Sequence, residues 1–217
     1  MKLNLTLKKA IAEFLGVLMF VTSIVASISS QRPLPQLALA ITLGLAILIT
    51  AGISGGHLNP AVSLFFYARR EISLGDLAVY LVAQIAGAFA GAAIGALLWD
   101  KTLTGFSANS MPAWSTIGGE LFATGGLVFL IGFLVTNKRA ALIPAAVALW
   151  VFAAATFTQT GAQANPAVSL GLTIAGQGTS STAWFILAQL AGALIATGFL
   201  IVFNAKAVKP AKKKAKK

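Results

Sequence analysis

The chain carries the same short motif twice, and each copy places an Asn-Pro pair inside an apolar region. Residues 54–64 read SGGHLNPAVSL and residues 160–170 read TGAQANPAVSL, with Asn165 lying 106 positions after Asn59. Two further pairs, Glu13 with Glu120 and Gln84 with Gln189, recur at offsets within one residue of this value. Because three landmarks recur in the same order, we interpret the chain as two homologous halves, and this internal repeat is the strongest constraint on its fold.

Both halves have the composition of membrane segments. Hydrophobic residues make up 58% of the chain, its mean hydropathy is +0.87, and 10% of its residues are charged, against about 25% in soluble domains. We therefore expect an all-α membrane protein. The first apolar run is interpreted as a retained span and not as a signal peptide, because it contains Glu13 and lacks a small-residue cleavage site. Six runs of about 20 residues, the length that crosses a bilayer, begin near Ala10, Gln36, Asp76, Ser115, Ala140 and Thr182.

Three spans in each half give the repeat an inverted topology, because an odd number of crossings turns the second half over. We assign residues 10–99 to the first repeat, 100–114 to a connecting loop and 115–204 to the second repeat. The segments 59–68 and 165–173, which start at the Asn-Pro pairs, are too short to span. Asn is a favoured helix N-cap and Pro is favoured at the first helical position, so each segment is predicted to be a half-helix that starts inside the membrane.

The two half-helices are expected to meet near the bilayer midplane. Irregular backbone at that depth has to line a wet cavity or lie buried in protein, and each half-helix N-terminus carries roughly half a positive charge from its dipole. Asn59 and Asn165 would offer side-chain donors to a passing solute at this cation-repelling constriction. In the alternative, each Asn only caps a buried helix, which we favour less for two copies related by an inverted repeat.

Basic residues are distributed unevenly between the two sides that six spans create. With both termini on one side, 14 of the 16 Lys and Arg residues lie there, and Arg32 and Lys101 lie opposite. Such a bias marks the cytoplasmic side, so we expect residues 1–9 and the basic tail, residues 205–217, in the cytoplasm and the protein in the plasma (inner) membrane.

The net charge of +11 is interpreted as a topology signal close to anionic lipid of the bilayer, and we expect no nucleic-acid partner. A specific lipid or protein partner of the tail is the alternative. The absence of cysteine excludes disulfides and thiolate metal sites. We expect no metal and no cofactor.

Two NPA motifs, the stretch SGGHLNPAVS and a Glu on the first and fourth spans make the chain resemble the aquaporin (major intrinsic protein) family over residues 10–204. The resemblance implies an aquaporin-like right-handed bundle of six tilted transmembrane helices plus two half-helices, and a homotetramer with one pore in each subunit. It also implies passive passage of water or small uncharged solutes, with ions and protons excluded. The implied constriction consists of Asn59, Pro60, Ala61, Asn165, Pro166 and Ala167.

The resemblance also suggests roles for other polar residues of the spans. Glu13 and Glu120 are intramembrane carboxylates, which are costly to insert and therefore functional candidates. In the family the matching glutamates accept hydrogen bonds from the half-helix loops and act as braces; a proton relay is the alternative. His57 and Gln163 stand two residues before each Asn and are expected to line the pore or support the loops, with a pH response of His57 as the alternative. No second titratable group accompanies His57, so we do not expect an enzyme.

The chain departs from the family pattern at the outer selectivity filter. In most of the family an Arg follows the second NPA motif and forms a narrow filter with residues of the second span, the fifth span and the loop. Here Val168 stands at the Arg position, and counting from the Asn residues puts the other places at Leu39, Ala153 and Ala162. These residues are apolar and two are small, so the filter is expected to be wide and to leave ion exclusion to the midplane.

Several functions stay open at this point. The leading hypothesis is a passive channel for water and small uncharged solutes, and the short connections at residues 99–115 and 159–181 favour water. The apolar filter favours the alternative, a glycerol, peroxide or gas facilitator with poor water conduction. Coupled transporters also use inverted repeats, but Glu13 and Glu120 have no basic partner within the spans. A closed structural membrane protein is the remaining possibility.

Overall fold

The computed structural model describes residues 4–104, 110–177 and 181–204, and all regular elements within these ranges are helical. Six helices are long and apolar enough to cross a membrane, which confirms the predicted spans. The basic tail, residues 205–217, lies outside the described residues. The long helices are α1 (Leu5–Ser29), α2 (Pro35–Ser54), α4 (Leu74–Leu97), α5 (Trp114–Thr136), α6 (Ile143–Phe157), which follows the short 3-10 turn η1 (Ala140–Leu142), and α8 (Thr182–Asn204).

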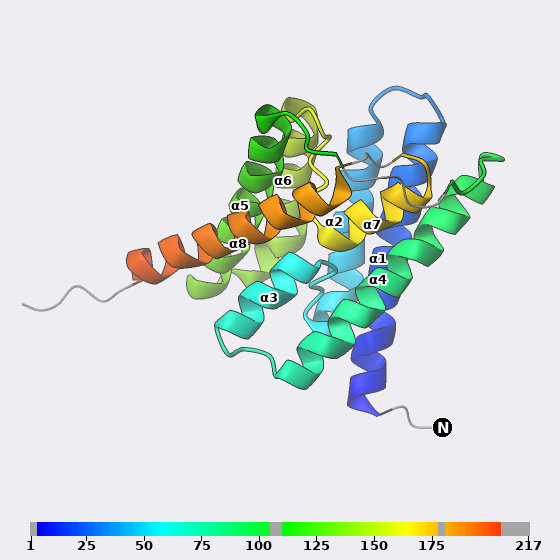
Figure 1. The fold of residues 1–217 in the computed structure, drawn as a ribbon. Helices are drawn as coiled ribbons and strands as arrows, with labels where there is room; N and C mark the ends of the chain where they lie inside the picture. Colours follow the sequence, from blue (N-terminus) through cyan, green and yellow to red (C-terminus); the bar gives the residue numbers. More distant parts are fainter. Residues whose placement is uncertain (1–3, 105–109, 178–180, 205–217) are drawn as a thin grey trace, which may run out of the picture.

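Two short helices, α3 (Pro60–Ala68) and α7 (Pro166–Ile174), contain nine residues each and are the predicted half-helices. Both start near the middle of the bundle and run outward in opposite directions, as Figure 1 shows, and they contact each other. Nine helical residues span about 14 Å at 1.5 Å per residue, which is about half the hydrocarbon core of a bilayer.

Local chemistry explains why each half-helix begins where it does. Asn59 and Asn165 have extended backbones with φ of −158°, and each is followed by Pro at the first helical position. The side-chain oxygen of Asn59 accepts a 2.8 Å hydrogen bond from the amide of Ala61, and that of Asn165 accepts a 3.0 Å bond from the amide of Ala167. Each Asn-Pro pair is thus an N-cap followed by a residue that needs no amide partner.

Helices α1 and α4 form the most extensive contact of the first half, and α5 and α8 form the equivalent contact of the second half. Glycines permit both approaches. A Cβ atom added to Gly87 on α4 would overlap with the carbonyl oxygen of Phe14 on α1, and one added to Gly192 on α8 would overlap with that of Leu121 on α5. These glycines let the helix backbones lie against each other, as small residues do in membrane bundles.

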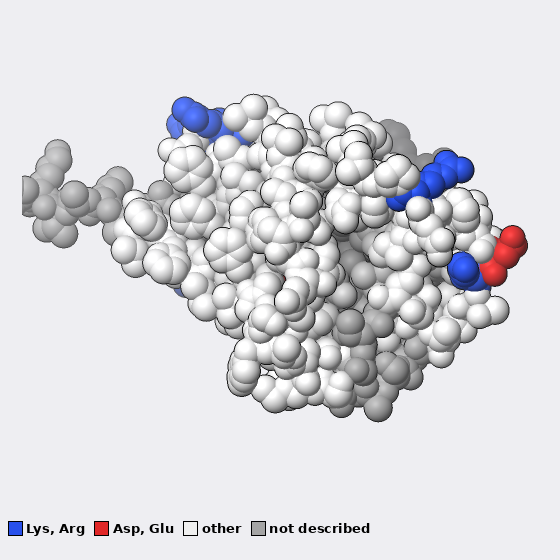
Figure 2. All heavy atoms as spheres, turned by 90° about the horizontal axis from the view of Figure 1, so that it is seen from above, with Lys and Arg blue, Asp and Glu red and all other residues white. Residues whose placement is uncertain are grey.

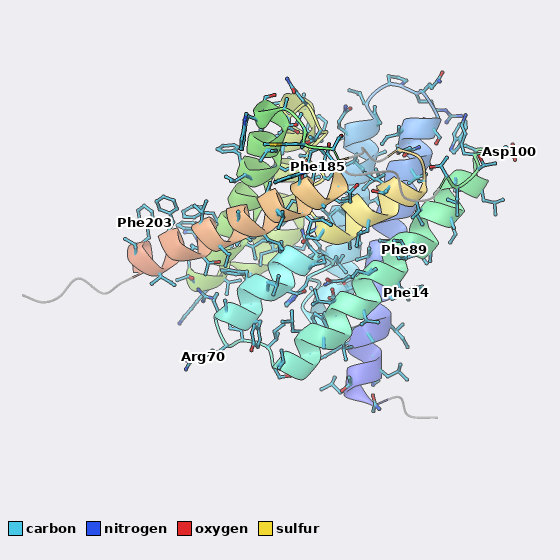
Figure 3. The ribbon with its side chains drawn as sticks, in the orientation of Figure 1. Phe14, Arg70, Phe89, Asp100, Phe185 and Phe203 are labelled. Atoms are coloured by element: carbon cyan, nitrogen blue, oxygen red, sulfur yellow. The ribbon has the colours of Figure 1, made fainter. Side chains whose placement is uncertain are left out.

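The end of the bundle at which α1 begins is called the N-terminal face below. Of the described basic residues, Arg32 and Lys101 follow the ends of α1 and α4 at the opposite face. Figure 2 looks at the molecule from above and shows charged side chains in small groups near its rim. In Figure 3, Arg70 and Asp100 mark opposite ends of the bundle. The remaining described basic residues lie in the first turns of α1 or next to helix ends at the N-terminal face: Lys8, Lys9, Arg69, Arg70, Lys138 and Arg139.

Candidate functional site

The two half-helices are joined by a reciprocal pair of hydrogen bonds at the centre of the bundle. Nδ2 of Asn59 donates to the carbonyl oxygen of Ala164 at 2.8 Å, and Nδ2 of Asn165 donates to the carbonyl oxygen of Leu58 at 2.8 Å. A side-chain amide nitrogen carries two hydrogens, so each Asn keeps a second N–H. Both side chains line the same central cavity. The predicted meeting of the two Asn residues is therefore observed, and each one also ties its half-helix to the opposite loop.

The loops that precede the half-helices use left-handed backbone conformations at equivalent places. Leu58 has φ of 50° and its counterpart Ala164 has φ of 46°, while Ala162 has φ of 49°. Such values are uncommon outside glycine, and the left-handed helical region costs roughly 1–2 kcal/mol for an L-residue. These conformations therefore need support from the surrounding structure.

Glu13 provides this support in the first half. Its Oε1 accepts hydrogen bonds from the hydroxyl of Ser54 at 2.6 Å and from the amide of His57 at 3.0 Å. Its Oε2 accepts from the amide of Leu58 at 2.7 Å and from Nε2 of Gln84 at 2.7 Å. The carboxyl group is fully buried behind the loop. Four donors converge on it, which is the arrangement that stabilises a buried carboxylate.

Glu120 makes the corresponding contacts in the second half. The hydroxyl of Thr160 and the amide of Gln163 donate to Oε1, the latter at 3.0 Å. The amide of Ala164 donates to Oε2 at 2.8 Å, and Nε2 of Gln189 donates to the same oxygen at 2.7 Å. Both glutamates thus bind the backbone of a half-helix loop. Neither is among the residues that line the described cavities.

Gln84 and Gln189 belong to this site although sequence reasoning used them only as landmarks of the repeat. Besides its bond to Glu13, Nε2 of Gln84 donates to the hydroxyl of Ser63 on α3 at 2.9 Å. Nε2 of Gln189 donates to the hydroxyl of Ser169 on α7 at the same distance. Each glutamine therefore connects a loop-binding carboxylate to the half-helix itself. The sequence signal for this role was the recurrence of a glutamine at equivalent places in two apolar spans, and the structure shows that both side chains are fully buried.

An inner cavity of about 40 Å³ lies on the N-terminal side of the Asn pair. The polar part of its lining, called the polar wall below, consists of residues 55–59 and 163–165. Across the described chain, the carbonyl oxygens of Gly55, Gly56 and His57 accept no hydrogen bond, which leaves them for a solute. The rest of the lining is apolar and consists of Phe20, Leu43, Ile47, Val62, Phe66, Leu127, Ile131, Ile143, Val147 and Val151.

An outer cavity of about 100 Å³ lies on the other side and adjoins the inner one, since Phe20 and Gln163 line both. The predicted filter residues Leu39, Ala162 and Val168 line it, together with Gln36 and Thr160. Gln163 therefore stands where the two cavities meet, whereas His57 lines the inner cavity alone.

The fourth predicted filter residue, Ala153, is not in this cavity. Ala153 lies on the exposed surface of α6, and Ala155, two residues later, lines the outer cavity and is buried. The register assumed for this helix is corrected accordingly. The reason is that α6 ends at Phe157 and a loop with left-handed residues separates it from Asn165, so counting back from Asn165 does not fix which face of α6 points inward.

Comparisons with known proteins agree with this geometry. The family model described as Major intrinsic protein matches residues 1–175. The chain is 33% identical over 210 residues to "Aquaglyceroporin AqpS" of Rhizobium meliloti, covering 89% of this chain and 88% of that protein. It is 32% identical to "Aquaporin PIP2-7" of Musa acuminata, covering 76% and 68% of the two chains.

A solved structure also matches, that of the aquaglyceroporin from Plasmodium falciparum. The TM-score is 0.70 at 25% sequence identity, and the match covers 89% of this chain and 95% of that one. The inverted arrangement of the helices, the joined half-helices and these similarities all indicate the same family. The chain belongs to the major intrinsic protein family of membrane channels.

Proposed function

We propose that the protein is a passive channel for water and small uncharged solutes that excludes ions and protons at the paired half-helices. The observation that carries the proposal is the pair of adjoining cavities on either side of Asn59 and Asn165. Membership of a family of channels, with relatives named aquaporin and aquaglyceroporin, supports it.

The walls of the inner cavity suggest how a solute would pass. The free carbonyl oxygens of Gly55, Gly56 and His57 offer acceptors, and the second N–H groups of Asn59 and Asn165 offer donors at the junction. The rest of the lining is apolar and offers neither. A file of water molecules would therefore replace only part of its lost hydrogen bonds, so it would be held weakly enough to move on.

Exclusion of cations would depend on the centre of the channel. Both half-helix N-termini point at the Asn pair, and each carries roughly half a positive charge. No fixed cation stands at the outer mouth, because Val168 occupies the Arg position and the described residues lining the outer cavity include no Lys or Arg. Selectivity against ions would thus rest on the dipoles and the Asn donors near the midplane.

A second candidate function is a facilitator for glycerol, peroxide or gases with poor water conduction. The apolar character of Leu39, Ala155, Ala162 and Val168 favours it, since these side chains offer water no compensating hydrogen bond at the outer mouth. A coupled transporter or a closed structural protein has less support, because Glu13 and Glu120 are committed to the loops. We expect no catalytic activity.

Stopped-flow light scattering on proteoliposomes tests the proposal. Water and then glycerol gradients are applied, with a pH-sensitive dye inside the vesicles and protein-free liposomes as the baseline. We expect faster shrinkage in the water gradient and faster re-swelling with glycerol, without faster dye response. Fast glycerol entry with baseline water flow would favour the facilitator. A solute flux that depends on a proton gradient would favour a transporter, and baseline values for all solutes would favour a closed protein.

Assembly and orientation are parts of the same proposal. We propose a homotetramer in the plasma (inner) membrane, as the family resemblance implies. The N-terminal face would lie in the cytoplasm, because the described basic residues concentrate at that face. The chain has no cysteine, so single cysteines introduced at Lys8 and Lys101 can be labelled separately. We expect an impermeant maleimide added outside cells to label the Lys101 position alone, and chemical cross-linking to stop at four subunits.

A further inference from the structure

We propose that His57 is held as the neutral tautomer with its proton on Nε2, and that this N–H is a fixed hydrogen-bond donor to solutes in the inner cavity. The proposal rests on the proposed channel function and adds a specificity-determining residue to it. The evidence is a chain of hydrogen bonds that runs from Glu13 through Gln84 and Ser63 to the ring.

The first step is the orientation of the Gln84 amide. Glu13 receives four hydrogen bonds, and an ionised carboxylate can only accept. The nitrogen of the amide must therefore face the carboxylate, because the amide oxygen would be repelled. This nitrogen lies 2.7 Å from Oε2 of Glu13 and 2.9 Å from Oγ of Ser63, so both of its hydrogens are engaged.

The second step is the direction of the Ser63 hydroxyl. Because Oγ of Ser63 accepts a hydrogen from Gln84, its own single hydrogen is free to be donated. The polar atom it reaches is Nδ1 of His57, 3.2 Å away. Nδ1 then acts as an acceptor and carries no hydrogen, so the proton of a neutral imidazole has to lie on Nε2.

The third step is the fixed orientation of the ring. His57 stacks on Phe66 with 4.4 Å between ring centroids and 17° between planes. Tyr80 meets it edge-on at 5.0 Å. A Cβ atom placed on Gly55 would lie 3.2 Å from Nε2, so a glycine there leaves room beside this nitrogen. Nε2 has no hydrogen-bond partner among the described residues, and the ring lines the inner cavity.

A donor at this place complements the rest of the polar wall. The neighbouring carbonyl oxygens are acceptors, and the side-chain amides of Asn59, Asn165 and Gln163 are further donors. An N–H on His57 would bind the oxygen of a water or hydroxyl group before the solute reaches Asn59. The inner cavity would thus select solutes that both donate and accept.

The second repeat supplies a matched control. Ser169 accepts a hydrogen from Gln189 as Ser63 does from Gln84, but Gln163 stands at the position equivalent to His57. Removing the Ser169 hydroxyl therefore disturbs an equivalent half-helix without touching the imidazole.

The chain has a single histidine, so ¹⁵N NMR of histidine-labelled protein in proteoliposomes reports on His57 alone. We expect an unprotonated Nδ1 and a protonated Nε2 in the wild type. Ser63→Ala should produce signal from the other tautomer, and Ser169→Ala should leave the spectrum unchanged. A wild-type spectrum with the proton on Nδ1, or the same response to both variants, would overturn the assignment.

The role in permeation needs a separate measurement on variants whose size-exclusion profile matches the wild type. His57→Leu removes the donor, and we expect water permeability per inserted subunit to fall by roughly three- to tenfold, the effect of one net hydrogen bond. His57→Gln restores a donor of the kind found at Gln163 and should recover most of the flux. Equal permeability of His57→Leu and the wild type would refute the donor role while leaving the channel intact. A wild type that conducts nothing would refute the proposed function instead.

Discussion

Asn59 donates a 2.8 Å hydrogen bond from Nδ2 to the carbonyl oxygen of Ala164, the residue directly before Asn165. Asn165 returns an equal bond to Leu58, the residue directly before Asn59. Each half-helix is thus positioned by the loop of the other repeat. A change at either Asn is therefore expected to affect both halves of the channel.

Replacing this donor by an acceptor tests the junction. In Asn59→Asp a carboxylate oxygen would face the Ala164 carbonyl, so a buried bond is lost at a cost of about 1–3 kcal/mol. The new charge would also neutralise the half-helix dipoles that repel cations. We expect a lower melting temperature in detergent and a faster proton leak in dye-loaded proteoliposomes.

Asn4→Asp is the control for this change, since Asn4 caps α1 at an exposed site and Asp is an equally good N-cap. A leak of the same size in both variants would mean that the midplane does not set ion exclusion.

The glutamates that bind the half-helix loops are expected to be sensitive to substitution by glutamine, which has nearly the same size and shape. Glu13→Gln replaces one accepting oxygen by a donor. Whichever way the new amide turns, it leaves the backbone amide of His57 or that of Leu58 without its acceptor. Each orphaned buried donor costs about 1–3 kcal/mol. We expect thermal unfolding in detergent at a clearly lower temperature, and the same for Glu120→Gln.

Glu71→Gln serves as the comparison, because Glu71 pairs with Arg69 in a partly exposed ion pair that contributes about 1 kcal/mol or less. An equal decrease of the unfolding temperature in Glu13→Gln and Glu71→Gln would show that Glu13 does not stabilise the half-helix loop.

Helix contact through glycine leads to a further test. Gly87→Ala places a Cβ atom against the backbone of α1, whereas a Cβ at Gly198 meets nothing within 4 Å. We expect Gly87→Ala to lower the melting temperature and the yield of folded protein. Gly198→Ala should be neutral or stabilising by up to about 1 kcal/mol, the difference in helix propensity. A stabilised Gly87→Ala protein would show that α1 and α4 do not pack this closely.

Val168→Arg addresses the outer mouth. Val168 is buried and lines the outer cavity beside Leu39 and Ala162, so a guanidinium there would narrow the cavity and add permanent charge and several donors. We expect the permeability to glycerol to fall more than the permeability to water, and any cation leak to decrease.

Val168→Met adds bulk without charge, so it separates the effect of narrowing the cavity from the effect of the added charge. It should reduce glycerol permeability while leaving the cation leak as it was. An unchanged glycerol-to-water ratio in the Arg variant would mean that Val168 does not line the narrowest part of the outer channel.

The half-helices could be located from the sequence because the chemistry that starts them is local. An Asn followed by Pro specifies an N-cap and a first helical residue without reference to the rest of the chain. The six spans could be predicted equally well, since each is a run of apolar residues long enough to cross a bilayer. The resemblance then indicated the carboxylates, and the observed contacts of Glu13 and Glu120 follow the implied pattern.

The face of α6 that points toward the cavity could not be predicted from the sequence in the same way. One helical residue turns the side chain by about 100°, so an error of two residues moves it by about 200° around the helix. Ala153 and Ala155 differ by this amount, and only the path of the loop before Asn165 decides between them. The partners of Gln84 and Gln189 were missed for a related reason, because those contacts depend on packing between distant helices.

The reciprocal Asn bonds also have a consequence for biosynthesis. The carbonyl oxygen of Leu58 finds its donor in Asn165, 107 residues further along the chain. At a translation rate of about 5–20 residues per second, Asn165 is synthesised roughly 5 to 20 seconds after the first motif. During that interval a polar loop lies at membrane depth without its permanent contacts. A nascent chain stalled between the two motifs is therefore expected to be the intermediate most dependent on an insertase and most sensitive to membrane proteases.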